Sequence, residues 1–169
     1  PIEGPSLQPL SYQYQVEKVA LANPMEIRVN PNGSNGRMTL DAAVELLPPG
    51  GTIVLEDGDY PGLTLPVSAS GTPEAMKTLK TAGDKVRFTG DYLHEASYWN
   101  VSNIEVAGAR VIVHGSHNQF SHMVTHSAPD TGFQISSPEK IGRALWASYN
   151  IVTDSESFNN MDKSQINAD

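Results

Sequence analysis

The chain has 169 residues, with eleven Lys and Arg against nineteen Asp and Glu, for a formal net charge of -8. No apolar run approaches the roughly 18 residues of a membrane span, and no basic cluster offers a face to phosphates, so neither membrane nor nucleic acid is an expected partner. The absence of Cys excludes disulfide frameworks and thiolate metal sites, while 14 Gly, 12 Pro and only 18% charged residues favour many short strands.

The first part of the chain predicts little regular structure. Residues 1–28 are interpreted as an N-terminal extension with one strand or short helix at Tyr14–Ala22. The alternation at Ile27–Val29 predicts a strand, and a loop rich in Asn, Pro and Gly follows it. The chain from residue 29 to residue 169 is therefore the expected folded part.

One helix is predicted after this loop. Thr39 can cap it, and Asp41 lies near its positive end. Its apolar positions follow helical spacing: Leu40, Ala43, Val44 and Leu47. The Pro-Pro-Gly-Gly run at 48–51 should end the helix, and Thr52–Leu55 then reads as a short apolar strand.

The rest of the chain repeats one pattern of eight residues, at 99–106, 118–125 and 150–157, with offsets of 19 and 32 residues. The third position is apolar, as Val101, Phe120 and Val152. The fourth position carries a hydroxyl, as Ser102, Ser121 and Thr153. The fifth position is polar, as Asn103, His122 and Asp154. Each unit reads as a strand followed, after a turn, by a second short strand. A constant unit with one enlarged connection is typical of a solenoid.

The repeat favours an all-β fold, a parallel β-helix in which apolar positions stack from coil to coil. Asn118 and Asn150 can form an internal ladder, and Trp99 aligns with them, so it is read as inner-face packing. The short helix can cap the N-terminal end of the stack, because an exposed sheet end invites further pairing. By the same reasoning the end at Asp169 needs more coils or a partner.

Several segments also carry a family resemblance. In the first half they are Val29–Ser34, Thr39–Val44, Pro49–Leu55 and Ser97–Ser102, and in the second half Asp130–Ser136, Asp154–Asp162 and Asn167–Asp169. These segments resemble the secreted right-handed parallel β-helix lyases, most closely polysaccharide lyase family 9, the pectate-lyase-like enzymes. The resemblance implies a right-handed helix whose first coils are residues 29–169 and which continues past the chain end.

The same resemblance implies a function. In the family an Asn-Ala-Asp element supplies one carboxylate to a catalytic calcium ion, and the matching residue here is Asp169. The other ligands and the catalytic lysine lie on later coils, and no Lys of this chain matches that base. The expectation is a bacterial secreted, calcium-dependent lyase acting on uronate-containing polysaccharide by β-elimination. This chain alone is expected to be inactive, with the remaining coils on a second chain or missing.

Calcium needs six to eight oxygen ligands, so Asp169 requires neighbours. Asp130, Asp154 and Asp162 lie in the same coils, but turn or surface roles are favoured for all three. Four histidines between residues 114 and 126 invite a zinc hypothesis: His114, His117, His122 and His126. Their spacing matches no zinc motif, so surface or ladder positions are favoured.

Sugar contact is assigned to the long connection before residue 150. Trp99, Trp146 and Tyr149 could stack on sugar rings, and Trp146 is the preferred one of the three. The charge of -8 should repel a polyuronate, and calcium or the nearby Arg110 and Arg143 can reverse the sign locally. Arg143 and Trp146 are thus the candidate substrate-binding residues.

Two other classes of function stay open. One is a non-catalytic β-helix that binds glycans, such as an adhesion or phage tail module. The other is a different β-helix enzyme, either a glycoside hydrolase or a uronan epimerase. A hydrolase should place paired carboxylates across its groove, and this chain shows no adjacent Asp pair.

Overall fold

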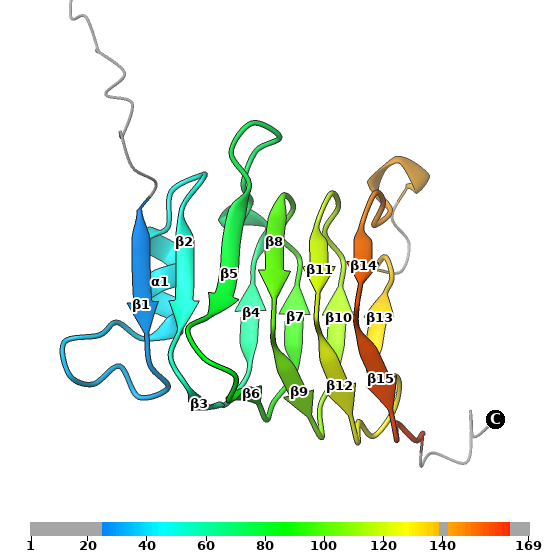
Figure 1. Cartoon of the computed structure of the whole chain (residues 1–169). Coiled ribbons are helices and arrows are strands. Elements are labelled where there is room, and N and C mark those ends of the chain that lie inside the picture. The colour runs from blue at the N-terminus through cyan, green and yellow to red at the C-terminus, as the bar shows by residue number, and fades with distance from the viewer. Residues whose placement is uncertain (1–24, 139–141, 163–169) are drawn as a thin grey trace, which may run out of the picture.

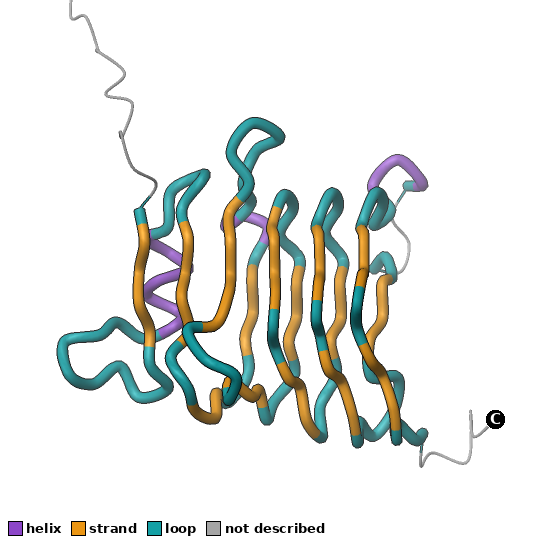
Figure 2. The backbone as a smooth tube through the Cα atoms, viewed as in Figure 1, coloured by secondary structure: helices purple, strands orange, loops and turns teal. Residues whose placement is uncertain are grey.

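The computed structural model describes residues 25–138 and 142–162, which form a parallel β-helix with three strands in each full coil (Figures 1 and 2). Sheet A is ordered β1 (Glu26–Val29), β2 (Thr52–Leu55), β5 (Lys77–Thr81), β8 (Trp99–Ser102), β11 (Gln119–Ser121) and β14 (Ile151–Thr153). Sheet B is ordered β3 (Gly58–Tyr60), β6 (Val86–Phe88), β9 (Glu105–Ala107), β12 (Val124–His126) and β15 (Glu156–Phe158). Sheet C is ordered β4 (Leu63–Leu65), β7 (Tyr92–His94), β10 (Val111–Val113) and β13 (Phe133–Ile135).

The offsets of the sequence repeat match the pairing register of the strands in sheet A. Asn100 pairs with Gln119, and Gln119 pairs with Ile151, so the offsets of 19 and 32 residues are those of successive coils. The all-β solenoid is therefore confirmed. The larger offset arises in the connection from β13 to β14, which contains the 3-10 helix η2 (Arg143–Leu145) and leaves the strand register unchanged.

The prediction that each eight-residue unit forms a single strand is wrong. Each eight-residue unit is two strands, one in sheet A and one in sheet B, with a sharp bend between them. The bend falls on the polar fifth position, where Asn103, His122 and Asp154 have φ values of 60°, 54° and 49°. Asn, Asp and His tolerate this left-handed region better than other residues do. The fifth position is therefore polar because the backbone turns there.

The core is built from columns of apolar side chains that run along the stack. In sheet A one column passes through inward positions of five paired strands: Ile27, Ile53, Leu79, Val101 and Phe120. These residues are almost fully buried, and each such side chain contributes about 1.5–3 kcal/mol relative to exposure. Val152 continues the column on β14 and is 41% exposed.

Helix α1 (Leu40–Leu46) covers the N-terminal end of this core, as its pattern predicts. Thr39 Oγ1 accepts a hydrogen bond from the Ala42 N–H at 3.3 Å, which caps the helix. The buried face of the helix packs against β1 and β4, on the inner side of the first strands (Figure 1). None of the helices in the described part of the chain has the length and apolar character required to cross a membrane.

The Asn ladder joins three coils where sheet A begins. Asn118 Oδ1 accepts the Trp99 N–H at 2.9 Å, and Asn118 Nδ2 donates to the Ala96 carbonyl at 3.0 Å. One coil later, Asn150 Oδ1 accepts the Asn118 N–H at 3.0 Å. Trp99 is fully buried, and its indole N–H donates to the Ala69 carbonyl at 3.0 Å, so its inner-face role is confirmed.

Candidate functional site

Two rims flank sheet C and are the places where functional side chains can gather. The C-to-A rim consists of the turns that link sheet C to sheet A, including residues 114–118 and 136–150. It lies along the top of the molecule in Figure 1, where two long connections project beyond the shorter turns, one before β5 and one before β14. The B-to-C rim consists of the turns that link sheet B to sheet C, including residues 127–132.

On the B-to-C rim, Arg110 is held between two carboxylates from neighbouring coils. Its backbone N–H donates to Asp91 Oδ1 at 2.9 Å, and its guanidinium lies 3.3 Å from Asp130 Oδ2 and 3.7 Å from Asp91 Oδ2. Two carboxylates balance its single charge, so Arg110 does not supply the free positive charge that the sequence suggested. Asp130 is accordingly an ion-pair and turn residue, and Asp154 is an exposed bend residue.

On the C-to-A rim, the structure brings the two predicted sugar-contacting residues together. Arg143 and Trp146 lie in and just after η2, and the Arg143 Cζ atom is 5.7 Å from the centroid of the Trp146 ring. Both side chains are exposed, Trp146 to 50%. The two ends of the loop are tied to each other, because the Ala147 N–H donates to Ser137 Oγ at 2.8 Å. An exposed ring beside a guanidinium can contact a sugar face and a carboxylate at once.

Next to this pair lies an aromatic column that the sequence did not reveal. Tyr98, His117 and Tyr149 stack with ring centroids 4.8 and 4.7 Å apart and nearly parallel planes. All three have positive φ, at 62°, 59° and 56°, one or two residues before the sheet A strand of their coil begins. Tyr seldom adopts this conformation, so the residue types gave no indication of the column. Tyr149 ends the column and is 76% exposed.

Neither metal hypothesis gains a site in the described part of the chain. His117 belongs to the aromatic column, His126 Nε2 lies 2.9 Å from Glu105 Oε1, and His122 occupies a bend. Across residues 25–138 and 142–162, no three His, Asp or Glu side chains gather closely enough to hold an ion. Asp169 lies outside these ranges. The residues described here therefore do not form a calcium site by themselves.

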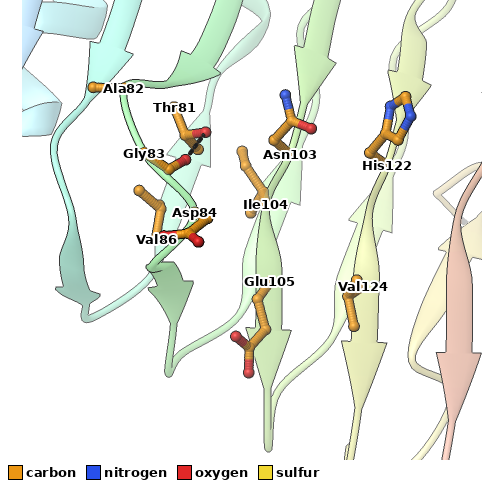
Figure 3. A pocket seen from close by; sticks show the side chains of 10 residues that line it. All are labelled: Thr81, Ala82, Gly83, Asp84, Val86, Asn103, Ile104, Glu105, His122 and Val124. Atoms are coloured by element: carbon orange, nitrogen blue, oxygen red, sulfur yellow. Dashed lines mark hydrogen bonds between the residues drawn. The ribbon is translucent and has the colours of Figure 1, made fainter.

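A groove of about 650 Å³ lies along the bends between sheets A and B (Figure 3). Asn103 and His122 mark two successive bends on one side of it, and Asp84 and Glu105 contribute carboxylates. The lining contains no aromatic side chain other than His122 and no Lys or Arg. Two acids without a basic side chain disfavour a polyuronate, so the C-to-A rim is the better sugar-binding candidate.

Two buried titratable residues lie close to the C-to-A rim, and the sequence did not predict the burial of either one. His94 is fully buried, its Nδ1 lies 2.8 Å from the Tyr92 hydroxyl, and burial lowers the pKa of its imidazole to about 3. Lys77 is 4% exposed, and burial lowers the pKa of its ammonium. A single His or Lys in an alternating strand pattern reads as outward-facing, which is why both were missed.

Comparison with known proteins gives a consistent result. Residues 25–169 match a family model described as "Pel9A-like, right handed beta helix region". A pectate disaccharide-lyase of Dickeya chrysanthemi is 39% identical over the whole of this chain, which covers 23% of that protein. A pectate lyase L of Thermoclostridium stercorarium is 30% identical over 85% of this chain and 13% of its own length. The chain thus spans about a quarter or less of these two relatives.

Among solved structures, the crystal structure of pectate lyase Pel9A is similar with a TM-score of 0.67. The two chains share 23% sequence identity, and the match covers 85% of this chain and 42% of the other. At this sequence identity the match supports the fold alone. It agrees with the stack of parallel strands, and the family model supplies the right-handed twist that the sequence resemblance implies.

Proposed function

The chain belongs to the Pel9A-like right-handed β-helix family, and from this membership we propose that it is the N-terminal part of a secreted, calcium-dependent pectate lyase. In this proposal the first coils begin with β1 and run to residue 169, slightly before the expected boundary at residue 29, and the part of the chain before β1 precedes them as an extension. The observation that carries the proposal is the 39% identity with a pectate disaccharide-lyase over the full length of this chain. The lyase names of the relatives favour this reading over the adhesion and hydrolase alternatives.

The substrate would be an acidic polysaccharide, held on the C-to-A rim by Arg143 and Trp146. A guanidinium presents a fork of N–H groups that matches a uronate carboxylate, and the charge-assisted bonds that form are the strong kind. The exposed face of Trp146 suits the C–H face of a sugar ring. The tether from Ala147 to Ser137 limits the freedom that the loop loses on binding.

The proposed reaction is β-elimination. A base removes the proton α to the uronate carboxylate, its electron pair forms a carbon–carbon double bond, and the glycosidic C–O bond breaks with protonation of the leaving oxygen. No described residue is offered as this base, because Lys77 is buried and Lys80 and Lys85 lie far along the stack from the C-terminal coils. The base is assigned to coils beyond residue 169, so the present chain should not cleave substrate.

Calcium dependence is part of the same proposal, with Asp169 as one ligand. Calcium needs six to eight oxygen ligands, so the proposal assigns the remaining donors to other residues of the longer polypeptide. The support for Asp169 is its match to the family's Asn-Ala-Asp element.

The test is a comparison of this chain with a polypeptide that continues past residue 169. Both are incubated with polygalacturonate, and the ultraviolet absorbance of an unsaturated product is followed with added calcium and with a chelator. The longer polypeptide should form product only with calcium, and this chain should form none. Product formed equally well in chelator would overturn calcium dependence, and no unsaturated product from the longer polypeptide would overturn the lyase.

The rim is tested separately in the longer polypeptide. Arg143→Ala and Trp146→Leu should each raise KM about tenfold or more, as expected for loss of a charge-assisted or stacking contact of about 1.5 kcal/mol. Arg28→Ala is the matched control, because Arg28 pairs with Glu26 on the first strand, far from this rim. Unchanged KM in both rim variants would show that Arg143 and Trp146 do not bind the substrate.

A further inference from the structure

The inward face of strand β5 carries a lysine at a core position, where an apolar side chain is expected. Lys77 and Leu79 are the buried positions of this strand, and Lys77 is only 4% exposed. On the next coil its partner in register is Trp99, which is fully buried. Lysine is almost never this buried unless its charge is paired. The groups that surround its ammonium must therefore explain how the charge is stabilised.

Among the described residues, no carboxylate forms an ion pair with Lys77. Its Nζ lies 5.7 Å from the centroid of the Trp99 ring, and this contact with the negative face of the indole is its electrostatic partner. Among residues 25–138 and 142–162, no ion pair or hydrogen bond reaches the ammonium, and burial alone lowers the pKa of Lys77. A buried ammonium without a carboxylate is costly.

The ammonium borders an open cavity. A space of about 380 Å³ lies between the end of α1 and the 3-10 helix η1 (Val67–Ala69), with Lys77 in its lining. Its walls are mainly apolar, formed by Val44, Leu47, Pro49, Pro66 and Ala69. Three polar side chains, Glu45, Ser68 and Ser70, complete the lining, and the first two are exposed.

The polar groups of the cavity leave Lys77 as its one charged donor. Ser70 Oγ already donates to the Val67 carbonyl at 2.7 Å and accepts the Ser97 N–H at 3.0 Å, so its one donor is not available to an anion. Glu45 carries a negative charge in the same lining. A dianion such as phosphate would keep one charge unbalanced beside Lys77 and Glu45 would repel it twice as strongly, whereas Lys77 alone balances a singly charged ligand.

We propose that this cavity binds a monocarboxylate, with Lys77 as its counter-ion and the apolar walls against the carbon skeleton of the ligand. A uronic acid monosaccharide fits this description, since it has one carboxylate and C–H faces that pack on proline and aliphatic side chains. The site lies at the end of the stack nearest α1, away from Arg143 and Trp146. It needs no lyase activity and is independent of the function proposed above.

The two tryptophans make a direct test possible. The Trp99 indole N–H donates to Ala69, a wall residue of the cavity, whereas Trp146 belongs to the C-to-A rim. In a ¹H–¹⁵N spectrum of the chain, titration with sodium galacturonate against sodium chloride of equal ionic strength should move the Trp99 indole signal with a saturable, millimolar response. Movement of the Trp146 signal reports the rim instead, so the two sites are told apart. No saturable change at Trp99 would overturn the proposal.

Lys77→Met keeps the length of the side chain and removes its charge, so it should abolish the Trp99 response. Lys80→Met is the matched control, because Lys80 is exposed on the same strand, and it should leave the response unchanged. An undiminished response in Lys77→Met would show that the charge is not what binds.

A second variant decides the question even where Lys77→Met does not fold. Glu45→Gln removes the like charge in the lining and should tighten galacturonate binding about threefold at low salt. Unchanged or weaker binding in Glu45→Gln would contradict the assigned charge balance. Inorganic phosphate is the competing probe, and phosphate that binds more tightly than galacturonate would overturn the monocarboxylate class.

Discussion

The fully buried imidazole of His94 should make the stability of this protein fall steeply in mild acid. In the folded chain burial lowers the pKa of His94 to about 3, whereas an unfolded histidine has a pKa near 6.5. The neutral form is therefore favoured by folding. Its contribution to stability is fully present above pH 6.5 and is lost progressively as the pH falls toward 3.

The size of the effect follows from the two pKa values. At pH 5 the unfolded chain has bound almost one proton at His94 and the folded chain has bound none. The free energy of unfolding should then be lower than at pH 8 by about 2 kcal/mol from this residue alone. That difference is roughly a 30-fold change in the folding equilibrium constant.

The assay is urea unfolding at pH 8, 6.5 and 5, followed by circular dichroism. His94→Gln keeps an acceptor near the Tyr92 hydroxyl and cannot titrate, so it should be less stable at pH 8 but lose about 2 kcal/mol less than the parent between pH 8 and 5. The control is His122→Asn, because His122 is an exposed bend residue and Asn occupies the same bend at position 103. Equal pH dependence in the parent and in His94→Gln would refute the reasoning.

Substitutions at three further positions test the fold. Asn118→Ala leaves the Trp99 N–H and the Ala96 carbonyl without partners and should lower the free energy of unfolding by about 2–4 kcal/mol in urea titrations; a loss below 1 kcal/mol would mean that the ladder is dispensable. Thr39→Ala removes the cap of α1 and should cost about 1 kcal/mol in the same titration, with Thr39→Ser close to neutral. Asp154→Val should lower Tm through strain at φ 49°, whereas Asp154→Asn should not, and equal Tm values would contradict the bend assignment.

Much of the stack could be predicted because its rules are local or periodic. The helix follows from Thr39 and the apolar spacing after it, and the ladder follows from the alignment of Asn118 with Asn150. The bend at Asn103 was harder to foresee, since a polar residue inside an apolar alternation usually means an outward side chain rather than a change of sheet.

The candidate site was less predictable, because its features depend on contacts between coils. Arg110 looked free in the sequence, and only the stacking of neighbouring turns places Asp91 and Asp130 against it. Lys77 gave no signal, since its burial is decided by which face of β5 turns inward. Arg143 and Trp146 could be proposed because both fall in the connection that is enlarged within the sequence repeat, between β13 and β14.

That connection also shows where the fold can absorb change. The turn before β11 has five residues, at 114–118, and its equivalent before β14 has fifteen, at 136–150. Closing a loop three times as long costs only about 1 kcal/mol of chain entropy. Asn150 restores the register as soon as the loop returns, through its bonds to Asn118 and Gly115. Loops on this rim can therefore be lengthened, exchanged or randomised to alter recognition without re-engineering the scaffold beneath them.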